Sequence, residues 1–260
     1  LVFLQTEVGR KSDYFSQRSV IRQLRPFVLN FGPVPAKRDR WVRTHAFLPW
    51  HVNATSVQDP KDPALARDYD YFSALTGLEK NRGTSMVLSS HSHLEGHRKR
   101  LRFAERILGE LGVEVDRFGN GVNPVSHKWD ALSPYRYTLV LENNAYPFGM
   151  TEKLSDAFLS LCVPFYYGDP RANLVYPKAS FVPIDIDLPA LALETIRREL
   201  EENNYERRAS SLISAKNRYL ATQDLFTRIL RIVGWMSAKI PEGRRKTISP
   251  PSGLREGTYI

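Results

Sequence analysis

The sequence predicts an α/β protein whose C-terminal part is a doubly wound domain, and three observations support this prediction. Two segments, 86–118 and 137–167, each read as a strand, a helix and a second strand, which is the βαβ pattern of a parallel sheet. A further apolar run, Val2–Leu4, reads as a strand in a separate N-terminal part. The polar, glycine-containing stretch 76–84 lies between these parts and reads as a linker.

The chain therefore divides into three predicted parts. We place an N-terminal domain at residues 1–80, a C-terminal domain at 81–238, and a basic, flexible tail at 239–260. Leu1 is followed at once by a predicted strand, which is compatible with an N-terminal domain that is incomplete in this chain. The remaining predicted elements are strands within 27–35 and 179–186 and helices over 69–75, 190–203 and 205–235.

Composition limits the class of partner. The chain has 37 Lys and Arg against 28 Asp and Glu, which gives a net charge of +9 and a pI near 9.6. Such a charge suits an anionic partner, whether nucleic acid, a phosphorylated metabolite or an anionic membrane surface. The single cysteine, Cys162, follows an apolar helix face, so we expect an inert core thiol in a reducing compartment. No run approaches the roughly 20 apolar residues that span a bilayer, and the first residues show no signal-peptide pattern.

The stretch 137–170 carries the strongest prediction of chemistry. Tyr137–Leu141 reads as a buried strand, and a helix with Leu154, Ala157, Phe158 and Leu161 on one face leads into a second strand at 163–167. In a βαβ unit, the end of the first strand and the start of the helix meet at one crevice, where backbone N–H groups and the helix dipole attract an anion. We expect four polar residues in that crevice, namely Glu142, Asn143, Glu152 and Lys153.

Arg100 is expected to face the same crevice from the upstream unit. It precedes Ala104, Ile107 and Leu111 at helical spacing in the predicted helix 97–111, so its side chain lies on the inward face. An inward cation needs an anionic partner, since an unpaired buried charge is costly. That partner is either an ordinary ion pair or a ligand.

Three short motifs have alternative explanations. The cluster 37–43 mixes basic and aromatic residues and could bind nucleic acid, although such a cluster is more often a solvated face. Asp68-Tyr69-Asp70 and Asp185-Ile186-Asp187 match the DxD metal site of some glycosyltransferases, but turns and helix caps use the same residues.

Three histidines form a further candidate site. His91, His93 and His97 could bind zinc, but no cysteine accompanies them, and a loop before a helix has other uses for histidine. We therefore predict no metal site in this chain.

Several motifs follow one another over about 100 residues. The central ones are Leu141-Glu142-Asn143, Met150-Thr151-Glu152-Lys153, Tyr167-Gly168-Asp169-Pro170 and the segment 176–182, and the upstream ones are Ser89-Ser90, Arg100 with Phe103, and 115–119. Their order and spacing resemble the α-1,3-fucosyltransferase family of glycosyltransferases. The resemblance is strong as a series, because any one of these motifs alone would be weak.

The resemblance implies a GT-B-like fold, in which two Rossmann-like domains face a cleft and the C-terminal domain holds a nucleotide sugar. It implies metal-independent, inverting transfer of fucose from GDP-fucose, without a cofactor. In that case Arg100 and Lys153 face the diphosphate, Glu152 binds sugar or ribose hydroxyls, and Asn143 positions the sugar donor. Glu142 either contacts the donor or fixes its loop.

Inversion also needs a general base for the acceptor hydroxyl. In the family this base is a glutamate that follows a strand of the N-terminal domain, and the best match here is Glu7. The asparagine that accompanies it in the family is replaced by Val8.

One departure leaves the sugar donor open. Where the family usually has an aromatic residue before its threonine-glutamate-lysine motif, this chain has Gly149, with Phe148 and Tyr146 nearby. A different nucleotide sugar is therefore an alternative, and a non-catalytic nucleotide- or nucleic-acid-binding protein is another.

The acceptor and the cellular location follow only from the enzyme interpretation. We expect a glycan or lipid-linked glycan of a surface polysaccharide or lipopolysaccharide, and a cytoplasmic enzyme that contacts the membrane peripherally and binds no nucleic acid. The oligomeric state does not follow from the sequence.

Overall fold

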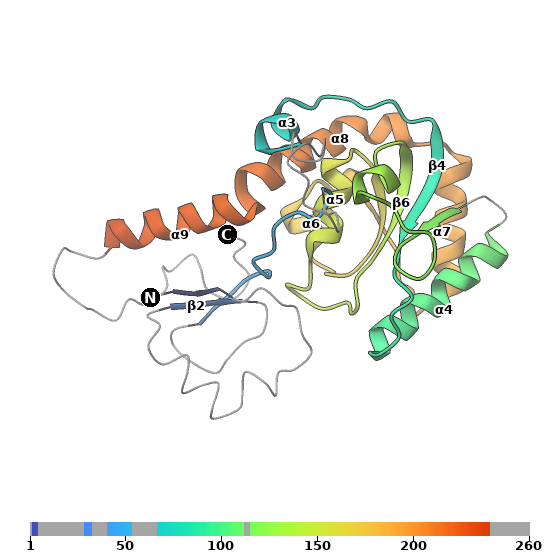
Figure 1. Cartoon of the computed structure of the whole chain (residues 1–260), viewed down its shortest axis with the longest axis horizontal. Helices are drawn as coiled ribbons and strands as arrows, with labels where there is room; N and C mark the ends of the chain where they lie inside the picture. The colour runs from blue at the N-terminus through green and yellow to red at the C-terminus, as the bar shows by residue number, and fades with distance from the viewer. Residues whose placement is uncertain (1, 5–28, 33–40, 54–66, 112–114, 240–260) are drawn as a thin grey trace.

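The computed structural model describes residues 2–4, 29–32, 41–53, 67–111 and 115–239 (Figure 1). These residues form two parallel β-sheets, with helices packed around the larger sheet. The fold is therefore the α/β class that the sequence predicts.

The larger sheet has five strands in the order β5-β4-β6-β7-β8, and each neighbouring pair is parallel. The strands are β4 (Arg82–Val87), β5 (Val115–Phe118), β6 (Tyr135–Leu141), β7 (Val163–Tyr167) and β8 (Val182–Pro183). β6 and β7 consist almost wholly of aliphatic and aromatic residues, and nearly every residue in them is buried. This is the pattern of central strands that helices cover on both faces.

Helices pack on the sheet in two groups. They are α4 (Glu95–Glu110), α5 (Glu152–Leu159), α7 (Pro189–Glu201) and α8 (Tyr205–Arg218), with short helices α3 (Tyr69–Ala74), α6 (Ala172–Val175), η2 (Lys128–Ala131) and η3 (Lys178–Ser180). α4 contacts α7, whereas α5 contacts α8 and the strands β6 and β7. The crossover from β4 to β5 and the crossover from β6 to β7 run in opposite directions across the sheet. Because both crossovers are expected to be right-handed, their helices lie on opposite faces of the sheet.

The chain reverses its direction across the sheet between β4 and β6. From β4 it moves outward to β5, and from β6 it moves the other way to β7 and β8. The carboxyl ends of β4 and β6 therefore flank a topological switch point, where open α/β sheets bind their ligands.

A smaller parallel sheet lies in the N-terminal part, with the order β1 (Val2–Leu4), β2 (Leu29–Gly32) and β3 (Trp41–Arg43). The segment after β3 runs from this sheet to the larger domain (Figure 1), and Thr44 to Phe47 are buried. Arg228 holds this segment, because its guanidinium donates to the carbonyls of His45 and Ala46. The described residues thus connect the two sheets through a packed segment.

The predicted linker 76–84 overlaps a strand. β4 begins at Arg82, so the last residues of the predicted linker are its first half. Arg82-Gly83-Thr84 lacks the apolar pattern of a buried strand, but pairing with β5 and β6 on both sides forms it. The predicted strand 179–186 is also wrong in extent, since only Val182–Pro183 pair with β7.

The prediction of one long helix over 205–235 is wrong. The chain forms α8, then a π-helical turn at Tyr219–Gln223, then α9 (Leu225–Lys239). Asp224 separates them, because its side chain accepts hydrogen bonds from the backbone N–H groups of Phe226 and Thr227 and so caps α9.

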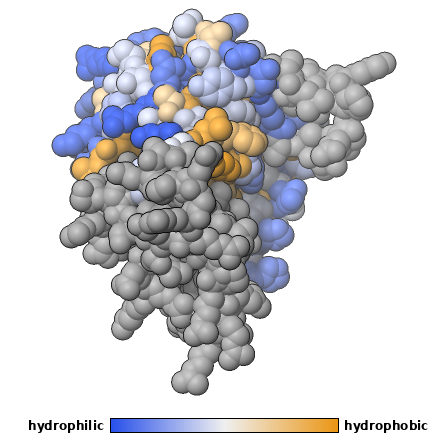
Figure 2. Space-filling model, turned by 90° about the vertical axis from the view of Figure 1, so that its left-hand side faces the viewer, coloured by the Kyte–Doolittle hydropathy of each residue, from blue (hydrophilic) through white to orange (hydrophobic). Residues whose placement is uncertain are grey.

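The apolar positions predicted for that helix divide between core and surface. Leu212, Ala215 and Tyr219 are buried, whereas three on α9 are exposed, namely Phe226, Leu230 and Val233. Figure 2 shows a mainly hydrophilic surface, with apolar surface gathered beside the residues drawn in grey.

Other predicted elements are confirmed closely. Val2–Leu4 and Val163–Tyr167 are strands with the predicted bounds, and α4, α5 and α7 lie within two residues of the predicted helices. Within the described ranges, no helix is both long enough and apolar enough to cross a bilayer. The division at residue 80 remains a prediction, and the tail from 240 onward lies outside the described residues.

Candidate functional site

The predicted site residues from both βαβ units meet at the switch point. Leu88 and Glu142 follow β4 and β6, and the helices α4 and α5 start beside them. α4 approaches the loop after β6 so closely that a Cβ on Gly96 would lie 2.1 Å from the carbonyl oxygen of Asn143. The glycine therefore permits the contact that brings Arg100 to this loop.

Glu142 is buried and fixes the loop that leads into α5. One carboxylate oxygen accepts from the backbone N–H and the hydroxyl of Thr151 at 2.8 and 2.7 Å. The other oxygen lies 3.1 Å from the Nζ of Lys153. With an exposed fraction of 2%, this side chain holds the loop, which was one of its two predicted roles.

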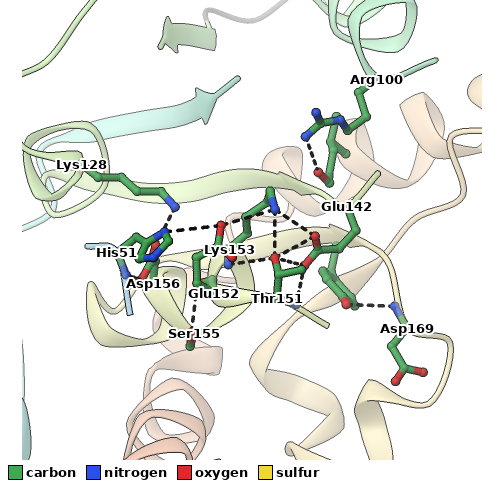
Figure 3. Close-up of polar contacts among 12 residues, drawn as sticks. His51, Arg100, Lys128, Glu142, Thr151, Glu152, Lys153, Ser155, Asp156 and Asp169 are labelled. Atoms are coloured by element: carbon green, nitrogen blue, oxygen red, sulfur yellow. Dashed lines mark hydrogen bonds and ion pairs between the residues drawn. The ribbon is translucent and has the colours of Figure 1, made fainter. Parts of the chain in front are cut away.

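Lys153 lies between two carboxylates at the start of α5 (Figure 3). Its Nζ donates to Glu142, to the hydroxyl of Thr151 at 2.9 Å and to Glu152 at 3.4 Å. Burial opposes the charged form, but the nearby charges of Glu142 and Glu152 outweigh it and raise the pKa of Lys153. The ammonium is thus held charged at the helix N-terminus.

The surroundings of Glu152 favour its ionised form. Burial raises its pKa, but the positive charges of Lys153, Lys128 and His51 outweigh this effect and lower the pKa to about 2. Its side chain is 15% exposed, so one edge of the carboxylate is open to a ligand. A permanent carboxylate is a hydrogen-bond acceptor for hydroxyl groups.

Arg100 points inward, as its helical phase predicts, and is 6% exposed. Its Nη1 donates to the carbonyl oxygen of Leu141 at 3.1 Å, and its buried Nε has no hydrogen-bond partner in the described part of the chain. Burial lowers its pKa, and the charges of Glu142 and Glu152 counter part of this shift. A buried guanidinium with unused N–H capacity can bind an anion.

The predicted histidine cluster faces the same positive crevice. Burial lowers the pKa of His97, and the charges of Arg100, His91, His93 and Lys153 lower it further. The ranges that the structure describes contain no group of three His, Cys, Asp or Glu side chains arranged to hold a metal ion. The lowered pKa of His97 thus reports a positive field in the crevice, which favours a negative ligand.

Asn143 and the following loop complete this crevice. The Oδ1 of Asn143 is buried and has no hydrogen-bond partner among the described residues, so it can accept a bond from a ligand. Phe148 adopts a left-handed backbone with φ of 67° and buries its ring beneath the guanidinium of Arg171. A Cβ on Gly149 would lie 2.8 Å from the carbonyl oxygen of Tyr146 and 3.5 Å from its ring, so the ring of Tyr146 lies beside the position of the family's aromatic residue.

Sequence reasoning missed His51, Lys128 and Asp156, which extend the cluster on the far side of Glu152 (Figure 3). The Nδ1 of His51 lies 3.9 Å from Glu152, and its backbone N–H donates to Asp156 at 2.8 Å. Asp156 is fully buried and pairs with the Nζ of Lys128 at 2.6 Å. Asp156 follows Glu152 by one helical turn, which is a signal in the sequence, but nothing there connects either residue with His51.

Thr151 belongs to a motif that the sequence indicated, and its capping role is one that the sequence could have predicted. Its side chain caps α5 by accepting from the N–H of Lys153, and Thr directly before a charged helix start is a common N-cap.

The other predicted groups have structural roles or lie outside the part of the chain that the structure describes. Asp68 caps α3, and Asp185 accepts from the N–H of Asp187 in a turn, so both DxD motifs have structural roles. Cys162 is buried, and burial raises the pKa of its thiol to about 11, as expected of an inert core cysteine. Glu7 and most of the cluster 37–43 lie outside the described residues.

Open space follows the ends of the strands beside the loop after Asn143. One cavity of about 660 Å³ is lined by Gly96, Lys99 and Asn144, and another of about 950 Å³ follows β7 and β8 past Gly168 and Asp185. Both are bordered by Ala145, in the loop after Asn143. A ligand bound at the switch point therefore has room to extend along this edge of the sheet.

Comparison with a family model identifies the same part of the chain. Residues 80–206 match the model described as glycosyltransferase family 10 (fucosyltransferase) C-term. A 4-galactosyl-N-acetylglucosaminide 3-alpha-L-fucosyltransferase of Pongo pygmaeus is 25% identical over 164 residues, which cover 56% of this chain and 46% of that protein. The chain thus spans about half the length of this relative.

Solved structures share the fold. A crystal structure of an alpha1,3-fucosyltransferase with GDP superposes with a TM-score of 0.54 at 17% identity, over 91% of this chain and 73% of that chain. The complex with GDP-fucose gives 0.50 at 19% identity, over 80% and 65%. A TarM mutant of S. aureus, crystallised with Fondaparinux, alpha-GlcNAc-glycerol and UDP, gives 0.51 at 10% identity, over 91% and 49%. The predicted GT-B-like α/β fold is confirmed.

Proposed function

We propose that this chain is a glycosyltransferase that moves fucose from GDP-fucose to a hydroxyl of a glycan, because residues 80–206 match the model of glycosyltransferase family 10 (fucosyltransferase). The observation that carries the proposal is the meeting of Arg100, Asn143, Glu152 and Lys153 at the switch point of the sheet that this family match covers. Parallel α/β sheets bind nucleotides at this location.

The sugar donor would lie with its diphosphate in the positive crevice. Arg100 has unused N–H groups there, the charges near His97 are positive, and α5 presents its N-terminus. The alpha1,3-fucosyltransferase whose fold this chain shares was crystallised with GDP and with GDP-fucose, which supports the choice of guanosine donor. With these protein cations the reaction is proposed to be metal-independent, so EDTA should leave binding of GDP unchanged.

The transfer itself is proposed to invert the anomeric carbon. Glu7 would take the proton from the acceptor hydroxyl, whose oxygen then bonds to the anomeric carbon as the bond to the diphosphate breaks. The electron pair of that bond leaves with GDP, and the cations near Arg100 stabilise the new charge. Glu7→Gln should bind GDP-fucose as the wild type does and lose transfer, whereas full transfer would overturn this assignment.

The acceptor and the location belong to the same proposal, and the charge of the chain is compatible with both. A net charge of +9 suits an enzyme that approaches an anionic membrane from the cytoplasmic side and acts on a lipid-linked glycan of a surface polysaccharide or lipopolysaccharide. Sedimentation with vesicles that contain anionic lipid, but not with neutral vesicles, is the expected result. Binding to neither would contradict the membrane contact and leave the transferase activity untouched.

A different nucleotide sugar is the second candidate, because Gly149 and the buried ring of Phe148 leave Tyr146 as the aromatic residue beside this position. A thermal-shift panel in EDTA tests both candidates with GDP, GDP-fucose, GDP-mannose, UDP and UDP-glucose. GDP and GDP-fucose should raise the unfolding temperature most, and a larger shift by a uridine nucleotide would establish the second candidate. If only DNA or RNA stabilises the protein, with a steep dependence on salt, the enzyme proposal is wrong.

A further inference from the structure

His51 is the polar side chain that faces Glu152 from outside the family-matched domain (Figure 3). The Nδ1 of His51 lies 3.9 Å from the Oε1 of Glu152, and its side chain is 46% exposed. Imidazole and carboxylate therefore face each other at the start of α5, and both side chains are partly exposed. In the part of the chain that the structure describes, Lys153 is the only side chain that donates a hydrogen bond to Glu152.

The neighbours of His51 hold it in this position. Trp50 packs edge-on against Phe72 and Tyr219, with ring centroids 5.6 and 6.5 Å apart. Val52 is fully buried, and its carbonyl accepts from the N–H of Trp129 at 2.8 Å. Because Trp50 and Val52 both anchor in the core, the backbone turns the side chain between them outward, toward the start of α5.

A buried ion pair fixes the backbone of His51. Its N–H donates to Asp156, which is 0% exposed and bonded to Lys128. Burial raises the pKa of Asp156, and Lys128 counters part of that shift. Asp156 thus anchors the backbone of His51 one helical turn after Glu152.

The cluster differs from one end to the other. The buried guanidinium of Arg100 lies at one end, and the partly exposed side chains of Glu152 and His51 lie at the other (Figure 3). A nucleotide sugar has a charged diphosphate next to a neutral ring of hydroxyl groups. The two ends of the cluster match these two parts.

We propose that His51 is a sugar-binding residue that acts with Glu152 to hold hydroxyl groups of the transferred sugar. The inference rests on the proposed function and adds to it a residue from the N-terminal segment. A carboxylate only accepts hydrogen bonds, whereas an imidazole ring also donates through its N–H. Together they recognise the arrangement of two hydroxyls, which a carboxylate alone does not.

Calorimetric titration of His51→Ala, His51→Gln and the wild type with GDP and with GDP-fucose tests this proposal. His51→Ala should bind GDP as the wild type does and GDP-fucose about tenfold more weakly, which corresponds to one lost hydrogen bond. His51→Gln, which keeps one donor and one acceptor, should recover part of the loss. Asn53→Ala is the matched control, because Asn53 lies in the same segment and bonds to Arg67 instead of the site.

The outcomes separate this inference from the proposed function. Equal affinity of His51→Ala and the wild type for GDP-fucose would overturn the inference and leave the proposed function standing. Equal weakening toward GDP and GDP-fucose would also overturn it, because the contact would then be to the nucleotide. A wild type that binds neither ligand would overturn the proposed function and the inference together. Because the side chain is half-exposed, the variants should keep the unfolding temperature of the wild type.

Discussion

At the scale of single residues, Glu142 organises the site although it is almost inaccessible to a ligand. It holds Thr151 at the N-cap of α5 and Lys153 in the first turn. The same carboxylate thus fixes the start of the helix and the cation next to Glu152. We interpret Glu142 as a positioning residue and Glu152 as the carboxylate that meets the ligand.

Glu142→Gln should destabilise the protein. The amide keeps the shape of the side chain but leaves the buried Lys153 with one fewer negative partner, and loss of one partner of a buried pair costs about 3 kcal/mol. Urea denaturation measures the change in the free energy of unfolding. The matched control is Glu105→Gln on the exposed face of α4, which should change stability by less than about 0.5 kcal/mol. Equal effects of the two substitutions would contradict the role of Glu142.

Much of the site could be predicted from local sequence, but the part formed by His51, Lys128 and Asp156 could not. Helical phase alone turned Arg100 inward, and the order of strand, loop and helix brought Asn143, Glu152 and Lys153 together. His51 escaped prediction because its contact with Asp156 joins residues 105 positions apart, and no local pattern encodes such a contact.

At the scale of elements, the approach of α4 to the loop after β6 decides whether the two βαβ units share a crevice. The contact passes through Gly96, whose hydrogen faces the carbonyl of Asn143. Since a backbone atom cannot swing away as a side chain can, any larger residue must move the helix or the loop.

Gly96→Ala should therefore destabilise the protein by about 2 kcal/mol and weaken GDP binding, because overpacking displaces Arg100 and Asn143. Gly109→Ala in the same helix is the control. A Cβ there meets nothing within 4 Å, so helix propensity should make the change neutral or stabilising by about 0.5 kcal/mol. Thermal unfolding with and without GDP measures both effects. A Gly96→Ala variant with the stability and affinity of the wild type would show that the contact between α4 and this loop tolerates a larger residue, and would contradict this prediction.

The elements that sequence patterns missed share a physical cause. Arg82–Thr84 reads as polar, but Arg82 pairs with Asp116 and packs on Tyr135, so tertiary contacts make it a strand. The break after α8 depends on the side chain of Asp224, which caps α9. The helical spacing of apolar residues continues across this break, so the pattern does not reveal it. The periodicity of apolar residues indicates which side chains favour burial, but it does not predict contacts with distant segments of the chain.

At the scale of the whole molecule, His45 and Arg228 join the N-terminal segment to the larger domain. Arg228 is buried on α9, donates to the carbonyls of His45 and Ala46, and lies 3.8 Å from the ring centroid of Phe47. His45 is also buried, 3.8 Å from Asp169 at the end of β7. Burial and the charges of Arg228 and Arg171 lower its pKa well below the usual value, so His45 is neutral in the folded protein.

This neutral histidine predicts a dependence of stability on pH. The unfolded chain binds a proton on His45 near pH 6.5 and the folded protein does not, so the free energy of unfolding should fall as the pH drops below about 6.5. The expected slope from one such group approaches 1.4 kcal/mol per pH unit. Urea denaturation between pH 7.5 and 5.5 measures it, and His45→Gln should flatten the curve. If the dependence of stability on pH is the same in that variant, other groups must cause it. His97 is one such group, because its pKa is also lowered in the folded protein.

The central claim is that the crevice around Arg100 binds the diphosphate of a nucleotide sugar. Its most direct test is calorimetric titration of GDP-fucose, in EDTA, into the wild type, Arg100→Ala and Arg198→Ala, the last an exposed arginine on α7. The wild type and Arg198→Ala should bind alike, and Arg100→Ala should bind at least about 30-fold more weakly, which corresponds to about 2 kcal/mol for a lost charge-assisted contact. No binding to the wild type, or equal binding to Arg100→Ala, would contradict the claim.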